Sequence, residues 1–142
     1  MKALHTLPYL LPACAVAACV EASPPAKLPQ TLSPIIVALV RPEPTAGSPF
    51  RGVLQIDERR CVSLRGAKSN YFLVWPVGTK VRNTERGWEV VTPRNAVLIN
   101  ATVMGNGTFV ASEGGGQLAR TSEWKTCARG EIIVVSGITE GN

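Results

Sequence analysis

Short apolar runs separated by turn residues fill the chain from Phe50 onward. Each run is rich in Val, Ile, Leu or aromatic residues and is bounded by Gly, Asn or Pro. Several runs alternate apolar and polar residues, which turns one face of a strand inward and the other toward solvent. Repeated about every 10 residues, this pattern predicts short strands rather than long helices. The runs are residues 51–56, 61–64, 70–75, 87–92, 96–104, 108–111 and 132–135.

The sequence predicts an all-β domain over residues 50–142, built as a small, partly closed, OB-like barrel of five to seven short strands. The 142-residue chain suits one domain, and its 13 Gly and 11 Pro provide many turns. We expect a hairpin turn at 105–108 (GNGT), because it contains Asn-Gly. Residues 117–126 form a short helix or an irregular loop, and SEGGGQ at 112–117 forms a turn rather than a phosphate loop.

Residues 1–18 have the composition of an export signal. Lys2 precedes an apolar run over 7–18, which is long enough for a signal-peptide core and too short for a membrane-spanning helix. The run leads into VAAC at 16–19, which resembles the lipobox of bacterial lipoproteins. The resemblance implies cleavage before Cys19, acylation of its thiol and attachment to a membrane of the bacterial cell envelope. The alternative is an ordinary signal peptide cleaved near Ala18, giving a soluble secreted or periplasmic protein.

Prolines mark the segment that follows. Residues 19–49 would form a lipidated N-terminus and a Pro-rich tether, because seven prolines within 20–49 fix φ and remove backbone donors. An extended chain of this length reaches on the order of 90 Å. Residues 35–40 (IIVALV) differ, since they are apolar and largely β-branched. They form either an added edge strand of the domain or a segment that docks on a partner.

Four cysteines are divided between the signal region and the domain. Cys14 leaves with the signal and Cys19 would carry lipid, so Cys61 and Cys127 remain. Export favours a disulfide between these two, because disulfides persist in oxidising compartments. The alternative is a pair of buried free thiols.

Short motifs within residues 50–137 are similar to those of small bacterial secreted or lipoprotein domains of unknown function. In those domains a Cys-bearing strand is followed by a Val-Trp-Pro strand and later by a Gly-rich turn. The resemblance implies a β-barrel and no established activity. The motifs are GVL at 52–54, CVSL at 61–64, LVWP at 73–76 and EGGG at 113–116.

Residue patterns for catalysis are missing from the predicted mature chain. The one histidine, His5, lies in the predicted signal, which excludes His-dependent nucleophilic sites and His-containing zinc sites. Asp57 and Glu58 are adjacent carboxylates, but neighbouring side chains on a strand or turn point apart. We therefore expect no enzyme activity, no metal site and no cofactor.

The net charge of +5 is spread along the chain, which argues against nucleic acid as a partner. Two tryptophans lie close to basic residues, Trp88 to Arg86 and Trp124 to Lys125. Such pairs are typical of ligand faces on OB-like barrels, and core packing is the alternative role for each tryptophan. The expected function is non-catalytic: an envelope protein, held at the membrane by its N-terminal lipid, whose barrel binds another protein or a glycan.

Overall fold

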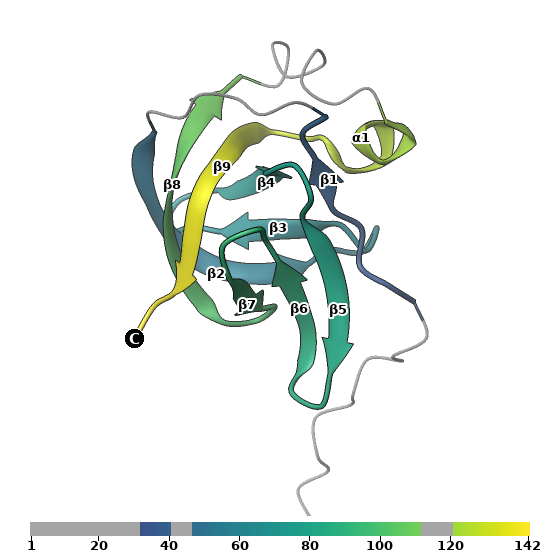
Figure 1. Ribbon diagram of the computed structural model, residues 1–142. Helices are drawn as coiled ribbons and strands as arrows, with labels where there is room; N and C mark the ends of the chain where they lie inside the picture. Colours follow the sequence, from purple (N-terminus) through teal and green to yellow (C-terminus); the bar gives the residue numbers. More distant parts are fainter. Residues whose placement is uncertain (1–31, 41–46, 112–120) are drawn as a thin grey trace, which may run out of the picture. The chain divides into compact units, whose positions relative to one another are not determined.

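Nine strands and one short helix form the part of the chain that the computed structural model describes, which is residues 32–40, 47–111 and 121–142 (Figure 1). The predicted signal, Cys19 and the Gly-rich segment at 112–117, with its predicted turn, lie outside the described residues. In chain order the elements are β1 (Val37–Ala38), β2 (Ser48–Ile56), β3 (Val62–Arg65), β4 (Asn70–Trp75), β5 (Lys80–Thr84), β6 (Gly87–Val91), β7 (Ala96–Leu98), β8 (Thr102–Val110), α1 (Ser122–Cys127) and β9 (Glu131–Glu140).

Five strands close into a barrel in the order β2-β3-β4-β9-β8, and β8 pairs again with β2. Only the β4–β9 pair among these is parallel, with Tyr71 beside Glu131 and Val74 beside Val134. The predicted all-β fold and small OB-like barrel are therefore confirmed, and the barrel is closed rather than partly closed. Strand β1 and a separate three-stranded sheet, β5-β6-β7, bring the strand number above the five to seven expected.

The second half of β4 and residues 132–135 of β9 are buried on both faces. Leu73 and Ile133 belong to one apolar cluster, whereas their neighbours Val74 and Val134 belong to a second. Strands covered on both faces are apolar along their whole length, which explains the runs YFLVW and IIVV. The first cluster, the barrel core, contains Phe50, Leu54, Val62, Leu64, Leu73, Trp75, Val90, Val97, Ile99, Val103, Ile133, Val135 and Ile138. The second, the outer core, contains Val37, Leu39, Cys61, Phe72, Val74, Cys127, Ile132 and Val134.

Strand β1 covers part of the outer core. Val37 lies beside Val74 of β4 in a parallel pair, and the backbone N–H of Leu39 donates to the carbonyl oxygen of Trp75 over 2.8 Å. The edge-strand interpretation of residues 35–40 is therefore confirmed, although only two residues form the strand. Strand β2 begins at Ser48, so the described fold includes residues from the segment assigned to the tether.

The predicted disulfide is present between Cys61 and Cys127, with the two Cα atoms 5.6 Å apart. Both residues are buried in the outer core, and the bridge links the start of β3 to the end of α1. It closes a loop with a sequence separation of 66. A loop of that length contributes about 4 kcal/mol of stability when chain entropy alone is counted.

The predicted hairpin turn at 105–108 is wrong, because these residues lie inside β8. Their glycines serve close packing instead: a Cβ on Gly107 would lie 2.5 Å from Cγ2 of Ile133 and 2.7 Å from the carbonyl oxygen of Val134. The turn comes earlier, at Asn100, which has a positive φ of 75°. This turn divides the predicted strand 96–104 into β7 and the start of β8.

Two further elements were predicted incompletely. Helix α1 overlaps the segment 117–126, expected to be a short helix or a loop, and extends one residue beyond it to Cys127. It begins after Thr121, whose side chain accepts a hydrogen bond from the Trp124 N–H. Strand β5 has the polar sequence KVRNT and was not expected. It forms because β6 provides an antiparallel partner from Val91 back to Gly87.

Candidate binding groove

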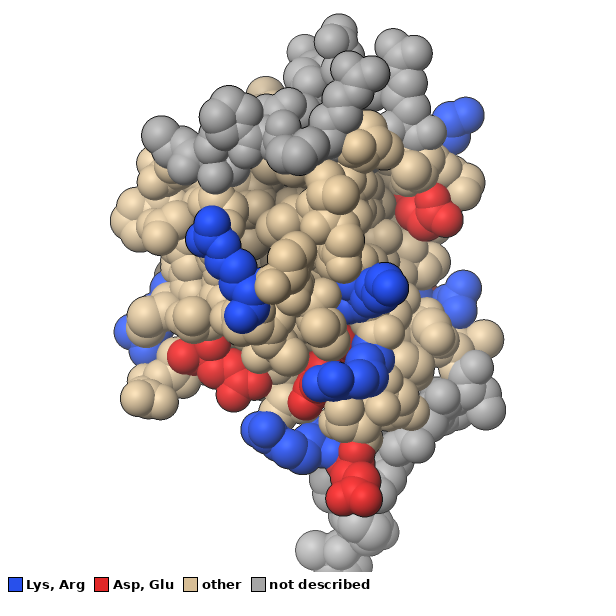
Figure 2. Space-filling view, viewed as in Figure 1, with Lys and Arg blue, Asp and Glu red and all other residues tan. Residues whose placement is uncertain are grey.

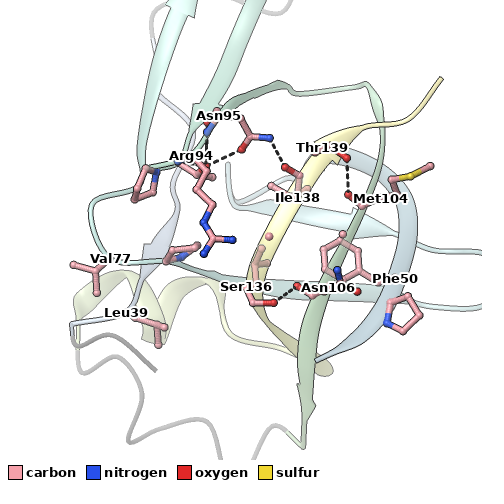
Figure 3. Close-up of a pocket in the computed structure, with 17 residues that line it drawn as sticks. Leu39, Phe50, Val77, Arg94, Asn95, Met104, Asn106, Ser136, Ile138 and Thr139 are labelled. Carbon is pink, nitrogen blue, oxygen red and sulfur yellow. Dashed lines mark hydrogen bonds between the residues drawn. The ribbon is translucent and has the colours of Figure 1, made fainter. Parts of the chain in front are cut away.

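A groove of about 740 Å³ lies along the second half of β9 (Figure 3). Strand β9 pairs with β4 only as far as Val134, and beyond that point it continues beside β8 alone. The segment after β4 and the turn between β6 and β7 complete the walls. The volume is within the usual range for ligand sites. The groove is lined by Leu39, Pro49, Phe50, Pro76, Val77, Thr92, Pro93, Arg94, Asn95, Met104, Gly105, Asn106, Val135, Ser136, Gly137, Ile138 and Thr139.

A β-bulge forms part of the groove wall. The β8–β9 register shifts after Asn106, which lies beside Gly137, whereas Gly107 lies beside Val135. Ser136 is the extra residue, and its hydroxyl donates to the carbonyl oxygen of Asn106 over 2.9 Å. Bulges bend a strand and are frequent beside binding sites. The shift thus gives β9 an irregular segment where it borders the groove.

Apolar side chains lie at both ends of the groove. Leu39 and Val77 are at one end, and Phe50 and Met104 are at the other (Figure 3). Val77 is 40% exposed and Met104 is 42% exposed, so both retain apolar surface that a ligand can cover. Prolines add further apolar surface without backbone donors: Pro49, Pro76 and Pro93.

Among the described residues that line the groove, Arg94 is the one that carries a charge. It belongs to the β6–β7 turn, and its side chain extends between the two apolar ends (Figure 3). Within the described part of the chain, its guanidinium group makes no ion pair or hydrogen bond; only its backbone N–H is used, donating to the hydroxyl of Thr92 over 3.3 Å. A guanidinium without a protein partner has all five donors available for an anion.

The turn that carries Arg94 is held by its neighbours. Thr92 and Asn95 exchange hydrogen bonds, with the Thr92 N–H donating to the Asn95 carbonyl over 2.8 Å and the Asn95 N–H donating to the Thr92 hydroxyl over 3.1 Å. The Asn95 side-chain amide also donates to the carbonyl oxygen of Ile138 in β9. These bonds fix the base of Arg94 relative to β9, while its long side chain remains exposed.

A second cavity, which we call the disulfide hollow, has a volume of about 590 Å³. Of its two arginines, Arg59 pairs with Asp57 at 3.0 Å and donates to the carbonyl oxygen of Thr126 over 3.1 Å, whereas Arg129 is exposed. Asp57 also accepts from the backbone N–H of Cys61 over 2.9 Å, so the side chains of Arg59 and Asp57 both have structural partners. The hollow is lined by Gln55, Ile56, Asp57, Glu58, Arg59, Cys61, Ser63, Asn70, Tyr71, Phe72, Cys127, Arg129 and Gly130.

No protein-family profile, curated protein or solved structure matches this chain. Similarity therefore assigns no ligand to either cavity, and functional arguments depend on the residues of the chain itself. The groove is the stronger candidate site, because Arg94 lies there with exposed apolar side chains that a ligand can cover, whereas the lining of the hollow has charged residues of both signs.

The described residues contain no group of three or more His, Cys, Asp or Glu side chains that could hold a metal ion. Nor does any helix over residues 32–40, 47–111 and 121–142 have the length and apolar character needed to cross a membrane.

The residues proposed from sequence as a ligand face lie on separate elements. Trp88 is in β6 and packs against the barrel core, whereas Trp124 is in α1 and packs against the outer core, with its ring 5.6 Å from that of Phe72. Arg86 and Lys125 are exposed. None of the four lines the groove or the hollow, so their role in binding stays a prediction.

Sequence reasoning missed the groove and its arginine. The available signal was the segment TPRN at 92–95, a tight turn with a basic residue between two predicted strands. The other lining residues come from distant parts of the chain, such as Leu39, Met104 and Ser136, and only the fold brings them together.

Proposed function

We propose that this protein is a non-catalytic lipoprotein of the bacterial cell envelope. Cys19 carries the lipid, the Pro-rich segment is the tether, and the barrel presents the groove to another molecule. A soluble secreted or periplasmic module with the same barrel is the second candidate, and it differs only in the fate of residue 19. An enzyme is a third, weaker alternative.

The observation that carries the proposal is the buried disulfide between Cys61 and Cys127. Bridges of this kind persist in oxidising compartments and are rare in the cytosol, so the bridge supports export. Export in turn agrees with the apolar run and the VAAC sequence at the start of the chain. With the disulfide formed and Cys14 removed, Cys19 is the remaining cysteine available for acylation.

The groove supports binding rather than catalysis. Its lining contains no acid among the described residues, and the hydroxyl of Ser136 already donates to a backbone carbonyl. This arrangement provides no base to activate a nucleophile. We therefore infer a site that holds a ligand without changing it.

Of the two expected kinds of ligand, a protein is favoured over a polysaccharide. Sugar sites use exposed aromatic rings and many polar groups. Among the described residues that line the groove, Phe50 is the one aromatic residue, and it is only 8% exposed. Nucleic acid is disfavoured because it needs several clustered cations. On the face in Figure 2, Lys and Arg lie among Asp and Glu and form no continuous basic area.

The experiment is metabolic labelling of the full chain with a clickable fatty acid in a bacterial host. The wild type is expected to incorporate label and to be found with the membranes. Cys19→Ala removes the label, whereas the matched variant Cys14→Ala retains it. Absence of label in the wild type, or equal labelling of Cys19→Ala, would overturn the lipoprotein proposal and favour the soluble module.

A further inference from the structure

We propose that the groove binds an extended segment of a partner protein in which an acidic residue is flanked by apolar residues two positions away on each side. This inference deepens the proposed function and rests on it. Arg94 would pair with the acidic side chain. Leu39 with Val77, and Phe50 with Met104, would receive the two apolar side chains.

The charge of the groove selects an anion. Arg94 is the only charged residue in its described lining, and no described carboxylate pairs with it. A guanidinium presents a planar fork of donors that matches the two oxygens of a carboxylate. A ligand that covers the apolar surfaces beside the exposed Arg94 side chain would exclude water from such a pair and strengthen it relative to one on an open surface. The complementary ligand therefore carries a carboxylate at this point.

The position of Arg94 in the groove indicates which kind of ligand would fit it. Its side chain lies between the two apolar ends of the groove (Figure 3). A fatty acid or other single-chain lipid has its charge at one end, so it would cover one apolar end and leave the other empty. A chain with a central charge and apolar groups on both sides matches the order found here.

An extended peptide has this order naturally. In a β-strand, residues i, i+2 and i+4 lie on the same face, with a rise of about 3.3 Å per residue. An apolar residue, an acidic residue and a second apolar residue at these positions would all face the groove, while the residues between them face solvent. Recognition of alternate side chains by pockets beside a strand is a recurrent mode of peptide binding.

The binding test uses fluorescein-labelled peptides and the full chain purified from bacterial envelopes in detergent. The probe peptide contains the core Leu-Ser-Glu-Ser-Val, and a matched peptide has Gln in place of Glu. We expect the Glu peptide to bind about 10- to 100-fold more tightly, which is the range for a hydrogen-bonded charge in a partly apolar site. Fluorescence anisotropy gives both dissociation constants.

Variants assign the effect to the groove. Arg94→Gln should remove the preference for Glu over Gln, and Arg94→Glu should instead prefer a Lys peptide. Val77→Ser and Met104→Ser should weaken the Glu and Gln peptides by similar factors, because they change only the apolar contacts. The matched control is Arg65→Glu, which changes an exposed arginine outside the groove and should leave both affinities unchanged.

Three results would overturn the inference. The first is equal or undetectable binding of the Glu and Gln peptides by the wild type. The second is a preference for Glu that survives in Arg94→Gln, once its circular dichroism spectrum shows the wild-type fold. The third is Arg94-dependent binding of palmitate micelles with no binding of peptides. Fatty-acid labelling of Cys19 is measured separately, so the proposed function can stand when the peptide inference fails.

Discussion

The groove and the disulfide hollow lie on one small barrel, yet Arg94 in the groove and Arg59 in the hollow differ in what their side chains contact. In the hollow, Arg59 contacts Asp57 and the backbone of α1, so its charge holds two segments of the fold together. In the groove, Arg94 has a fixed turn beneath it and no described partner for its side chain. The difference indicates that Arg59 is structural and that Arg94 is available for a ligand, although the two cavities have similar volumes.

Removal of the disulfide should have the largest effect and should act on the hollow. The double variant Cys61→Ala with Cys127→Ala is expected to lose about 4 kcal/mol of unfolding free energy, because the unfolded chain is no longer closed into a loop. Urea titration followed by tryptophan fluorescence measures the loss. Reductant should lower the stability of the wild type to a similar degree and leave the variant unchanged. An unaltered urea midpoint in the double variant would contradict the structural role of the hollow.

A substitution at the bulge tests the wall of the groove. Gly107→Val should cost about 1–3 kcal/mol, because the added atoms would press against Ile133 and Val134 of β9. Thermal unfolding followed by circular dichroism gives the comparison. Gly137→Ala is the matched control, since a Cβ there meets nothing within 4 Å, and it should unfold near the wild-type temperature. Equal melting temperatures for Gly107→Val and Gly137→Ala would show that β8 and β9 do not need this close approach.

Replacing Arg59 or Arg94 by glutamine compares the contributions of these two arginines to the free energy of unfolding. Arg59→Gln should destabilise the protein by about 0.5–1 kcal/mol, since it removes a partly exposed ion pair and a bond to the Thr126 carbonyl. Arg94→Gln should leave stability within about 0.5 kcal/mol of the wild type. Parallel urea titrations measure both. A larger loss for Arg94→Gln than for Arg59→Gln would reverse the roles assigned to the two cavities.

The smallest effect concerns Glu123 in the first turn of α1, the helix that borders the hollow. A backbone hydrogen bond, followed by bonds from the side chains of Thr121 and Ser122, lowers the pKa of Glu123 below its ordinary value of 4.5. Its contribution to stability is therefore present above pH 4.5 and is lost as the pH falls through the lower folded pKa.

An NMR titration of the Glu123 side chain measures this pKa. Thr121→Ala should raise the titration midpoint toward 4.5, because one hydrogen bond to the carboxylate is removed. Thr139→Ala, on β9, is the control and should not change it. A midpoint at or above 4.5 in the wild type would contradict the hydrogen bonding at the start of α1.

The fold was more predictable from the sequence than the groove. The apolar runs at 70–75 and 87–92 match β4 and β6 closely, because buried strands need continuous or alternating apolar residues whatever their partners. The disulfide followed from counting cysteines. The polar strand β5 could not be found in this way, since it depends on pairing with β6 rather than on its own composition.

The two main errors have a common physical origin. Asn106-Gly107 has the sequence of a tight turn, yet the glycine is needed where β8 approaches β9 closely. Arg94 resembles any exposed turn residue in the sequence, and its position between two apolar ends depends on residues as distant as Leu39 and Met104. The roles of Gly107 and Arg94 both depend on contacts with residues distant in the chain, and these contacts cannot be inferred from the neighbouring sequence.

The backbone bridge at Ile35, just before β1, also determines how the barrel would respond to mechanical force. Tension applied to the chain before Leu32 first meets backbone pairing at Ile35, whose N–H donates to the Arg60 carbonyl and whose own carbonyl accepts from the Val62 N–H. Cys61 lies between these two contacts and is covalently joined to Cys127. A pulling force on the N-terminal segment would therefore reach the disulfide before it reached the strands β8 and β9 that line the groove.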